Sequence, residues 1–317
     1  MLREQQELRG DMKAVNLALL LEESVQKHAD RPVLIADNRR ITYKQLHSAV
    51  HAVAPSLKNM GMGKGDKVAI MLPNIPEFVY CCFAVFQSGA VAVLLNTSST
   101  PAELCYLLNN SDAKILITQA SGEKRYREIK NQLLTCHSIY VTDSEENRSV
   151  MDQQSMVNES DSCATLINPD DPAMMIYTAG LTGKPLGAVL THHNLCEELN
   201  MIQPIFRREP DDIGLCLIPL FHSFGVTVNM LNVIQAGCST VMMDRFTMDG
   251  LLSTIERERI TYICAVPRLY VGMVLYEKTA KYDLSSLRLC VTGGSAMPPE
   301  FIPLFEQKLG VRILEGY

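Results

Sequence analysis

The stretch most suited to chemistry is a loop of small and polar residues at 177–187, which reads Tyr-Thr-Ala-Gly-Leu-Thr-Gly-Lys-Pro-Leu-Gly. Its glycines let backbone amides approach a ligand closely, its threonine hydroxyls can donate hydrogen bonds, and Lys184 can neutralise negative charge. This combination favours a phosphate group as the ligand. The spacing is not that of a Walker A loop, and an ordinary surface hairpin accounts for the composition about equally well.

Two further loops could also contact a ligand. Residues 219–225 read Pro-Leu-Phe-His-Ser-Phe-Gly, and His222 lies between aromatic residues, where it could orient a substrate in a pocket. However, an isolated histidine in a loop more often hydrogen-bonds to the backbone than binds a substrate. Residues 292–299 read Thr-Gly-Gly-Ser-Ala-Met-Pro-Pro, in which the paired glycines could let a flat ring lie on the backbone. The same pair equally serves a tight turn between a strand and a helix.

All three loops follow predicted strands, and the whole sequence alternates between strand and helix patterns. Strands are predicted at 33–36, 41–43, 67–72, 91–94, 113–118, 173–176, 213–218, 239–243, 262–266, 287–291 and 311–314. Helices are predicted at 17–28, up to 60, 78–87, 100–109, 226–235, 251–257, 268–278 and 299–309. This order predicts an α/β fold whose sheets are largely parallel and flanked by helices. In such sheets ligands bind at the carboxyl ends of the strands, where the three loops begin.

The length and a change in composition predict two α/β subdomains, residues 1–168 and 169–317. Residues 143–161 are rich in acidic and polar side chains, and we expect them to form a solvated connection at the end of the first subdomain.

The composition restricts the class of protein. The 317 residues include 29 Lys+Arg and 35 Asp+Glu, a formal net charge of −6, which argues against a nucleic-acid-binding protein. Residues 78–95 carry no charge, but a Gln-Ser-Gly interruption at 87–89 predicts a buried helix and strand instead of a transmembrane segment. Ten cysteines with no CxxC pair, and no secretory signal at the start, predict reduced thiols in a cytoplasmic protein.

Several separated motifs occur in a fixed order along the chain. The loop at 177–187 is followed by Leu-Thr-His-His-Asn-Leu at 190–195, then by the loops at 219–225 and 292–299. Further characteristic segments lie at 65–70, 72–74, 111–114 and 265–268. From about residue 17 to 317, this order resembles the adenylate-forming (AMP-binding) superfamily, which includes acyl-CoA synthetases, luciferases and the adenylation domains of peptide synthetases. Within it, 73–74 and 219–225 are most similar to the fatty-acyl and aryl-CoA ligases.

The resemblance implies a two-step ligase reaction that uses ATP, Mg²⁺ and coenzyme A. A carboxylate, here a fatty or aryl acid, would attack the α-phosphate of MgATP and give acyl-AMP and pyrophosphate. The thiol of coenzyme A would then displace AMP. Catalysis would depend on positioning and on stabilising charge on the phosphates. The implied fold is the large domain of such an enzyme, and the implied setting is fatty acid metabolism; no oligomeric state is implied.

By the same resemblance, residues in the three loops and at the end of the sequence would contact the substrates. The β- and γ-phosphates would be wrapped by the loop that contains Thr178, Ala179, Gly180, Leu181, Thr182, Gly183 and Lys184. His222 would be the catalytic residue beside the reacting carboxylate, with Phe224 and Gly225 along the acyl pocket. The adenine side would consist of Gly293, Gly294, Ser295, Glu315, Gly316 and Tyr317, with Tyr317 stacked on the base. Arg245 matches a basic position near coenzyme A, and no metal ligand is implied.

The phosphate loop departs from the family pattern at three positions. Ala179, Leu181 and Leu186 stand where the family has Ser, Thr and Lys. A charge-assisted hydrogen bond contributes about 1.5–3 kcal/mol, so these changes predict weaker ATP binding.

The sequence also ends at Tyr317, before the Gly-x-Thr-Glu motif and the lid domain that the resemblance leads us to expect. Two interpretations stay open. The chain is the N-terminal part of an acyl-CoA synthetase-like ligase that cannot complete the cycle alone, or it is a degenerate domain that binds nucleotide or acyl ligand without turnover.

Overall fold

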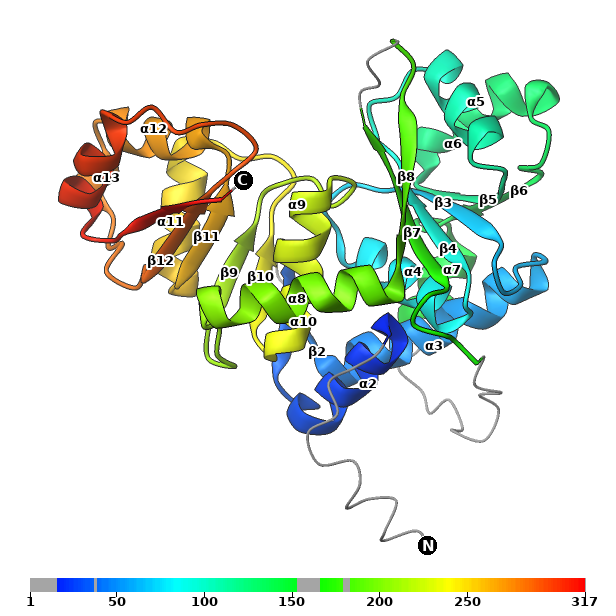
Figure 1. Cartoon of the computed structure of the whole chain (residues 1–317), viewed down its shortest axis with the longest axis horizontal. Coiled ribbons are helices and arrows are strands. Elements are labelled where there is room, and N and C mark those ends of the chain that lie inside the picture. Colours follow the sequence, from blue (N-terminus) through cyan, green and yellow to red (C-terminus); the bar gives the residue numbers. More distant parts are fainter. Residues whose placement is uncertain (1–15, 37–38, 153–165, 179–182, 317) are drawn as a thin grey trace, which may run out of the picture.

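The computed structural model describes residues 16–36, 39–152, 166–178 and 183–316, and it contains two β-sheets surrounded by helices (Figure 1). The six-stranded sheet has the order β6-β5-β3-β4-β7-β8. Its strands are β3 (Lys67–Met71), β4 (Val91–Leu94), β5 (Ala113–Thr118), β6 (Ser138–Val141), β7 (Pro172–Thr178) and β8 (Leu186–Thr191). All neighbouring strands are parallel except β7 and β8, which form an antiparallel hairpin.

The seven-stranded sheet has the order β13-β12-β11-β9-β10-β1-β2. Its strands are β1 (Pro32–Ala36), β2 (Arg39–Thr42), β9 (Ile213–Cys216), β10 (Ser239–Met242), β11 (Tyr262–Ala265), β12 (Leu289–Thr292) and β13 (Ile313–Glu315). Here too, all pairs are parallel except β1 with β2. The central strands are buried along their length, as expected for parallel strands covered on both faces.

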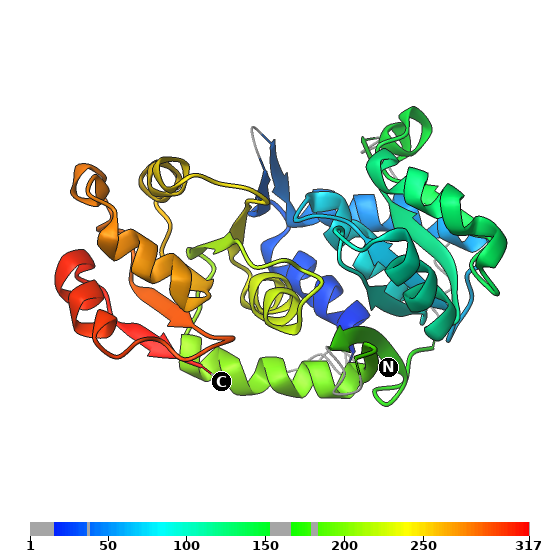
Figure 2. The ribbon, with the colours of Figure 1, turned by 90° about the horizontal axis from the view of Figure 1, so that it is seen from above.

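The helices form three layers around the two sheets (Figures 1 and 2). The middle layer fills the space between the sheets and comprises α2 (Leu17–His28), α3 (Tyr43–Asn59), α4 (Pro76–Gln87), α8 (His192–Phe206) and α10 (Asn232–Ala236). The outer face of the six-stranded sheet is covered by α5 (Pro101–Asn110) and α6 (Ala120–Ile129). The outer face of the seven-stranded sheet is covered by α11 (Met248–Glu258), α12 (Pro267–Leu275) and α13 (Phe301–Leu309). The predicted α/β class, with two helix-flanked and largely parallel sheets, is confirmed.

Local sequence patterns predicted several elements correctly. The uncharged segment 78–95 forms the buried helix α4 followed by the buried strand β4. Thr100 and Glu103 form the expected capping box at the start of α5, each side chain accepting the other's backbone N–H. Pro101 at the first helical position removes a backbone donor that would otherwise be unpaired.

Other expectations were wrong or incomplete. The acidic segment is not entirely a solvated connection, because Glu145–Asp152 form a helix, α7, that packs against α3. The helix expected at 226–235 is divided into α9 (Ser223–Val226), a π-helical turn (Thr227–Leu231) and α10. The long helix α8, which connects β8 to β9, was not predicted.

Each sheet takes strands from both sides of residue 168. The six-stranded sheet includes β7 and β8, which follow that residue, and the seven-stranded sheet includes β1 and β2 from the start of the chain. The two sheets therefore do not coincide with the expected segments 1–168 and 169–317. Each sheet combines strands from both segments, and the division into subdomains at residue 168 stays a prediction.

Two further expectations concerned reduced cysteines and the absence of a transmembrane segment. The nine cysteines within the described residues are free thiols, and all but Cys105 are buried; Cys163 lies outside those residues. Among the residues that the structure describes, no helix combines the length and apolar character needed to cross a membrane.

Candidate functional site

The loops singled out from the sequence all lie at carboxyl ends of strands. The loop at 177–187 joins β7 to β8, the loop at 219–225 follows β9, and the loop at 292–299 follows β12. Strands β9 to β13 run parallel to one another, so the loops that follow β9 and β12 lie at the same edge of the seven-stranded sheet. This is the edge at which α/β sheets bind ligands.

The base of the predicted phosphate loop is fixed to its surroundings by several contacts. Thr178 pairs with Leu186 across the β7–β8 hairpin, and the Thr178 hydroxyl donates to the Leu186 carbonyl oxygen at 3.4 Å. The Tyr106 hydroxyl donates to the Pro185 carbonyl oxygen at 3.0 Å, and the Lys184 ammonium lies 6.0 Å from the Tyr106 ring centroid. Helix α5 therefore anchors one end of the loop and holds Lys184 near it.

The tip of this loop is only partly within the described residues. Ala179, Gly180, Leu181 and Thr182 lie outside them. Gly183 has a φ of +83°, a left-handed conformation that favours glycine, and an added Cβ would find nothing within 4 Å. Among the residues that the structure describes, none approaches this side of Gly183.

His222 is the N-cap residue of α9, and its ring centroid lies 4.3 Å from that of Phe221. Loss of hydration through partial burial lowers the pKa of His222 below its usual range. The imidazole is therefore neutral at neutral pH, and one ring nitrogen can accept a hydrogen bond.

The path of the His222 loop is set by Asn74, which follows β3 and is buried. Its amide nitrogen donates to the carbonyl oxygens of Cys216 and Ile218, at 3.4 and 3.1 Å. Its Oδ1 accepts the backbone N–H of Leu220 at 2.9 Å. One side chain that follows β3 thus pairs with three backbone groups between the end of β9 and the loop that carries His222. The sequence marked Asn74 only as part of a family motif and gave no sign of this contact.

We expect Asn74→Ala to destabilise the protein by about 1–3 kcal/mol, because it leaves buried backbone groups of the loop unpaired. Urea unfolding followed by circular dichroism measures this. Asn96→Ala is the matched control, since Asn96 is exposed and, within the described part of the chain, its Oδ1 accepts only a local hydrogen bond from Ser98 N–H. The control is expected to stay within about 0.5 kcal/mol of the unaltered chain. Equal effects of the two substitutions would contradict the anchoring role of Asn74.

The second loop turns tightly at Gly225 and contacts the third loop where Phe224 lies beside Gly293. A Cβ added at Gly225 would lie 2.3 Å from the carbonyl oxygen of Pro219, so only glycine fits this turn. A Cβ added at Gly293 would lie 3.3 Å from the Phe224 ring and 3.3 Å from the carbonyl oxygen of Gly316. The close approach of these segments places Phe224 against the backbone of the Gly-Gly loop.

The end of the described chain borders the Gly-Gly loop. The Glu315 Oε1 accepts the backbone N–H of Met297 at 2.8 Å, and the backbone N–H of Gly316 donates to the Thr292 carbonyl oxygen at 2.8 Å. Gly294 has a φ of +82°, and its neighbour Ser295 is exposed. The structure thus brings together the predicted adenine-side residues Gly293, Gly294, Ser295, Glu315 and Gly316, while Tyr317 lies outside the described residues.

A pocket of about 330 Å³ opens between the two sheets. Its lining comes from the segments that follow β3, β4, β9 and β10, and consists of Leu72, Pro73, Asn74, Asn96, Thr97, Ser98, Pro219, Phe221, Asp244 and Arg245. The Arg245 side chain is 97% exposed, and its Nε lies 3.9 Å from the Asp244 Oδ2. Arg245 therefore lies at the pocket with its charge open to solvent. The polar segment 96–98 was missed in the sequence, although it directly follows a predicted strand.

A profile of AMP-binding enzymes matches residues 21–317. The chain belongs to the AMP-binding enzyme family. Among curated proteins, this AMP-binding chain is 28% identical to 4-coumarate–CoA ligase 3 of Arabidopsis thaliana over 306 residues, covering 93% of the chain and 54% of that protein. It is also 28% identical to an oxalate–CoA ligase of Arabidopsis thaliana over 317 residues, covering 96% of the chain and 61% of that protein. The AMP-binding chain therefore spans a little over half the length of these relatives.

Solved structures show the same relationship. The inhibitor-bound N-terminal domain of FACL13 from Mycobacterium tuberculosis superimposes with a TM-score of 0.87 at 26% identity, covering 96% of the AMP-binding chain and 76% of that domain. A fatty acyl CoA synthetase of Mycobacterium tuberculosis gives a TM-score of 0.84 at 25% identity, covering 97% of the chain and 60% of that protein. The described fold is thus that of the N-terminal domain of adenylate-forming enzymes.

The segment 190–195 has a structural role in this AMP-binding chain. Thr191 and Asn194 form a capping box at the start of α8. The Nδ1 of the buried His192 accepts the backbone N–H of Leu17 at 3.2 Å, and burial lowers the pKa of His192 to about 4. This histidine is therefore a neutral acceptor that holds the start of α2, at a distance of 175 residues in sequence.

Proposed function

We propose that this AMP-binding chain activates a carboxylic acid with ATP as part of an acid–CoA ligase. The observation that carries the proposal is the position of its motif-bearing loops. They lie at carboxyl ends of strands, loop 219–225 lines a pocket, and loops 219–225 and 292–299 are in contact. Its relatives in the family include CoA ligases for 4-coumarate and oxalate.

In the proposed reaction, the substrate carboxylate attacks the α-phosphate of MgATP and displaces pyrophosphate. Thr178, Thr182, Gly183 and Lys184 bind the β- and γ-phosphates, because hydroxyl, amide and ammonium donors stabilise the charge that the leaving group gains. His222 acts beside the carboxylate, where its neutral ring accepts or donates one hydrogen bond without adding a charge. Mg²⁺ enters as part of the MgATP substrate.

The remaining contacts are proposed in the same way. Phe224 and Gly225 border the acyl group, which we propose to be that of a fatty or aryl acid. The adenine lies against Gly293, Gly294 and Ser295, with Glu315, Gly316 and Tyr317 continuing that wall. Arg245 lies at the pocket and is a candidate for attracting the phosphates of coenzyme A, since its guanidinium is exposed. A cytoplasmic location fits the free thiols of the described cysteines.

We further propose that residues 1–317 do not complete the thioester-forming cycle alone. The resemblance assigns the catalytic lysine to a later domain, and the chain covers only 54% and 61% of the two CoA ligases compared above.

Isothermal titration calorimetry of the 317-residue chain tests the proposal. We expect MgATP and a non-hydrolysable acyl-AMP analogue to bind at one site, and the analogue to bind more tightly because it occupies both the nucleotide and acid positions. Absence of binding by both ligands would overturn the proposal. Carboxylate-dependent exchange of pyrophosphate into ATP then separates an adenylating domain from one that binds without turnover.

A further inference from the structure

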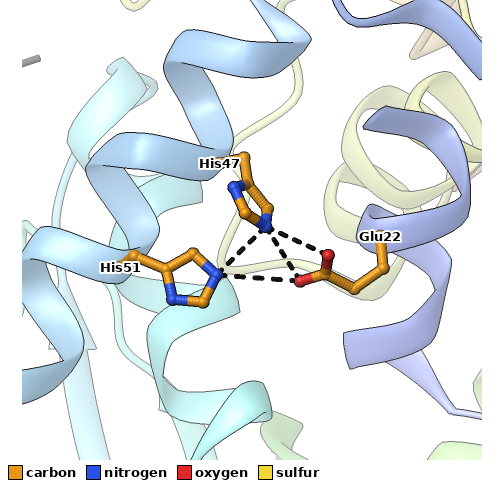
Figure 3. A group of neighbouring side chains, drawn as sticks. All are labelled: Glu22, His47 and His51. Atoms are coloured by element: carbon orange, nitrogen blue, oxygen red, sulfur yellow. Dashed lines mark hydrogen bonds and ion pairs between the residues drawn. The ribbon is translucent and has the colours of Figure 1, made fainter. Parts of the chain in front are cut away.

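A second group of reactive side chains lies outside the site described above, between α2 and α3 (Figure 3). Glu22 projects from α2, and His47 and His51 project from α3 toward it. The two histidines are four residues apart, so they lie on the same face of their helix one turn from each other. None of the three residues lines the pocket or belongs to the three loops.

We propose that Glu22, His47 and His51 bind one transition-metal ion of the Zn²⁺ class and so connect α2 to α3. Two imidazoles and one carboxylate are ligands that Zn²⁺ uses in proteins, and water can take a fourth position. The side chains are 25–37% exposed, which leaves a route for an ion and for that water.

The distances among the ligand atoms suit this ion. The His47 Nε2 lies 3.0 Å from the His51 Nε2, and 3.1 and 3.0 Å from the two carboxylate oxygens of Glu22. The His51 Nε2 lies 3.8 Å from the Glu22 Oε1. Ligand atoms at about 2.0–2.1 Å from a tetrahedral zinc ion are about 3.3–3.4 Å apart. The three side chains thus need only small movements to surround an ion.

The close approach of the two imidazoles also favours a cation. Two imidazole Nε2 atoms 3.0 Å apart cannot both carry a hydrogen directed at the other, so at least one lone pair faces the centre. The Glu22 carboxylate oxygens lie within 3.1 Å of the same His47 Nε2. An imidazole lone pair and a carboxylate therefore converge on the same point.

A neighbouring side chain holds the carboxylate in place. The Gln87 amide nitrogen, at the end of α4, donates to the Glu22 Oε1 at 3.0 Å. Outer hydrogen bonds of this kind orient metal ligands and commonly change metal affinity by about 10- to 100-fold. Three helices of the middle layer therefore contribute to the arrangement, and a bound ion would cross-link two of them.

The test uses the tag-free 317-residue chain, freed of metal with a chelator and titrated with Co²⁺ and then Zn²⁺. We expect one equivalent of Co²⁺ to produce the visible absorption of a four-coordinate ion, and Zn²⁺ to displace it and raise the Tm. His51→Ala and Glu22→Gln should each weaken binding by about ten-fold or more, because each removes one of three protein ligands.

His137→Ala is the matched control, since this histidine is exposed and outside the cluster. It should leave binding unchanged. A thiolate-to-cobalt absorption band would assign the ion to cysteine instead. That result would overturn the proposal, and so would the absence of stoichiometric binding. The proposal is also overturned if Glu22→Gln and His51→Ala bind the ion as tightly as the unaltered chain does. Circular dichroism without metal shows whether each variant is folded. If His51→Ala does not fold, Glu22→Gln still tests the proposal, because it keeps the shape of the side chain.

Discussion

The variant A179S/L181T/L186K is expected to bind MgATP at least about ten-fold more tightly than the unaltered chain. It restores two hydroxyl donors and one cation to the predicted phosphate loop. Leu186 is 60% exposed at the first position of β8, so a lysine there can reach the loop without being buried. One charge-assisted hydrogen bond contributes about 1.5–3 kcal/mol, and ten-fold in affinity corresponds to about 1.4 kcal/mol. Calorimetry with MgATP and carboxylate-dependent pyrophosphate exchange measure the two effects.

Val189→Lys is the control for added charge. Val189 is 50% exposed on the same strand as Leu186 and lies three residues farther from the loop. Val189→Lys therefore adds the same charge as the lysine of the triple variant, but at a greater distance from the phosphates. It should leave ATP affinity within about two-fold, because an exposed charge away from the phosphates is screened by solvent. If this control matches the triple variant, long-range charge explains the gain. If exchange rises by orders of magnitude only in the triple variant, the natural chain is a weakened adenylating domain.

Gly225→Ala is expected to destabilise the protein by about 3 kcal/mol and to abolish binding of the acyl-AMP analogue. The new Cβ would lie 2.3 Å from the Pro219 carbonyl oxygen, which belongs to the backbone and cannot move without displacing the loop. Overpacking in a well-packed region costs about 1–3 kcal/mol, and a backbone contact leaves less room for relief than a side chain does. The displacement would carry His222 and Phe224 with it. Urea unfolding and calorimetry with the analogue measure the two losses.

Gly63→Ala is the control for a glycine substitution in a loop. Its added Cβ would meet the Asp66 Oδ2 at 3.5 Å, an ordinary van der Waals distance, and Gly63 has no positive φ. Its stability should stay within about 0.5 kcal/mol of the unaltered chain. A Gly225→Ala protein that keeps both stability and ligand affinity would show that the turn at 219–225 adapts, and that glycine is not required there.

Elements set by neighbouring residues were the most predictable part of the fold. Helix α5 begins where its capping box and proline indicated, and α4 and β4 divide at Gly89, whose φ is +67°. Helix α8 was missed although Thr191 and Asn194 cap it, because Asn in place of Glu or Gln is a weak signal for a capping box. The division at 168 could not show which strands pair, since pairing joins segments far apart in the chain, such as β1 with β10.

The sequence by itself determined the family, the α/β class and the loops that carry its motifs. The family, the fold class and the motif-bearing loops depend on residue types at short spacing along the chain. Such local patterns can be identified without knowing where the preceding strand lies in its sheet. Only the tertiary structure decided that Asn74 holds the His222 loop and that Glu22 faces His47 and His51. These contacts join residues 146 and 25 positions apart. A side chain's partner at such separation depends on how helices and sheets pack. The apolar pattern of an element predicts that it is buried, but it does not specify which element it packs against.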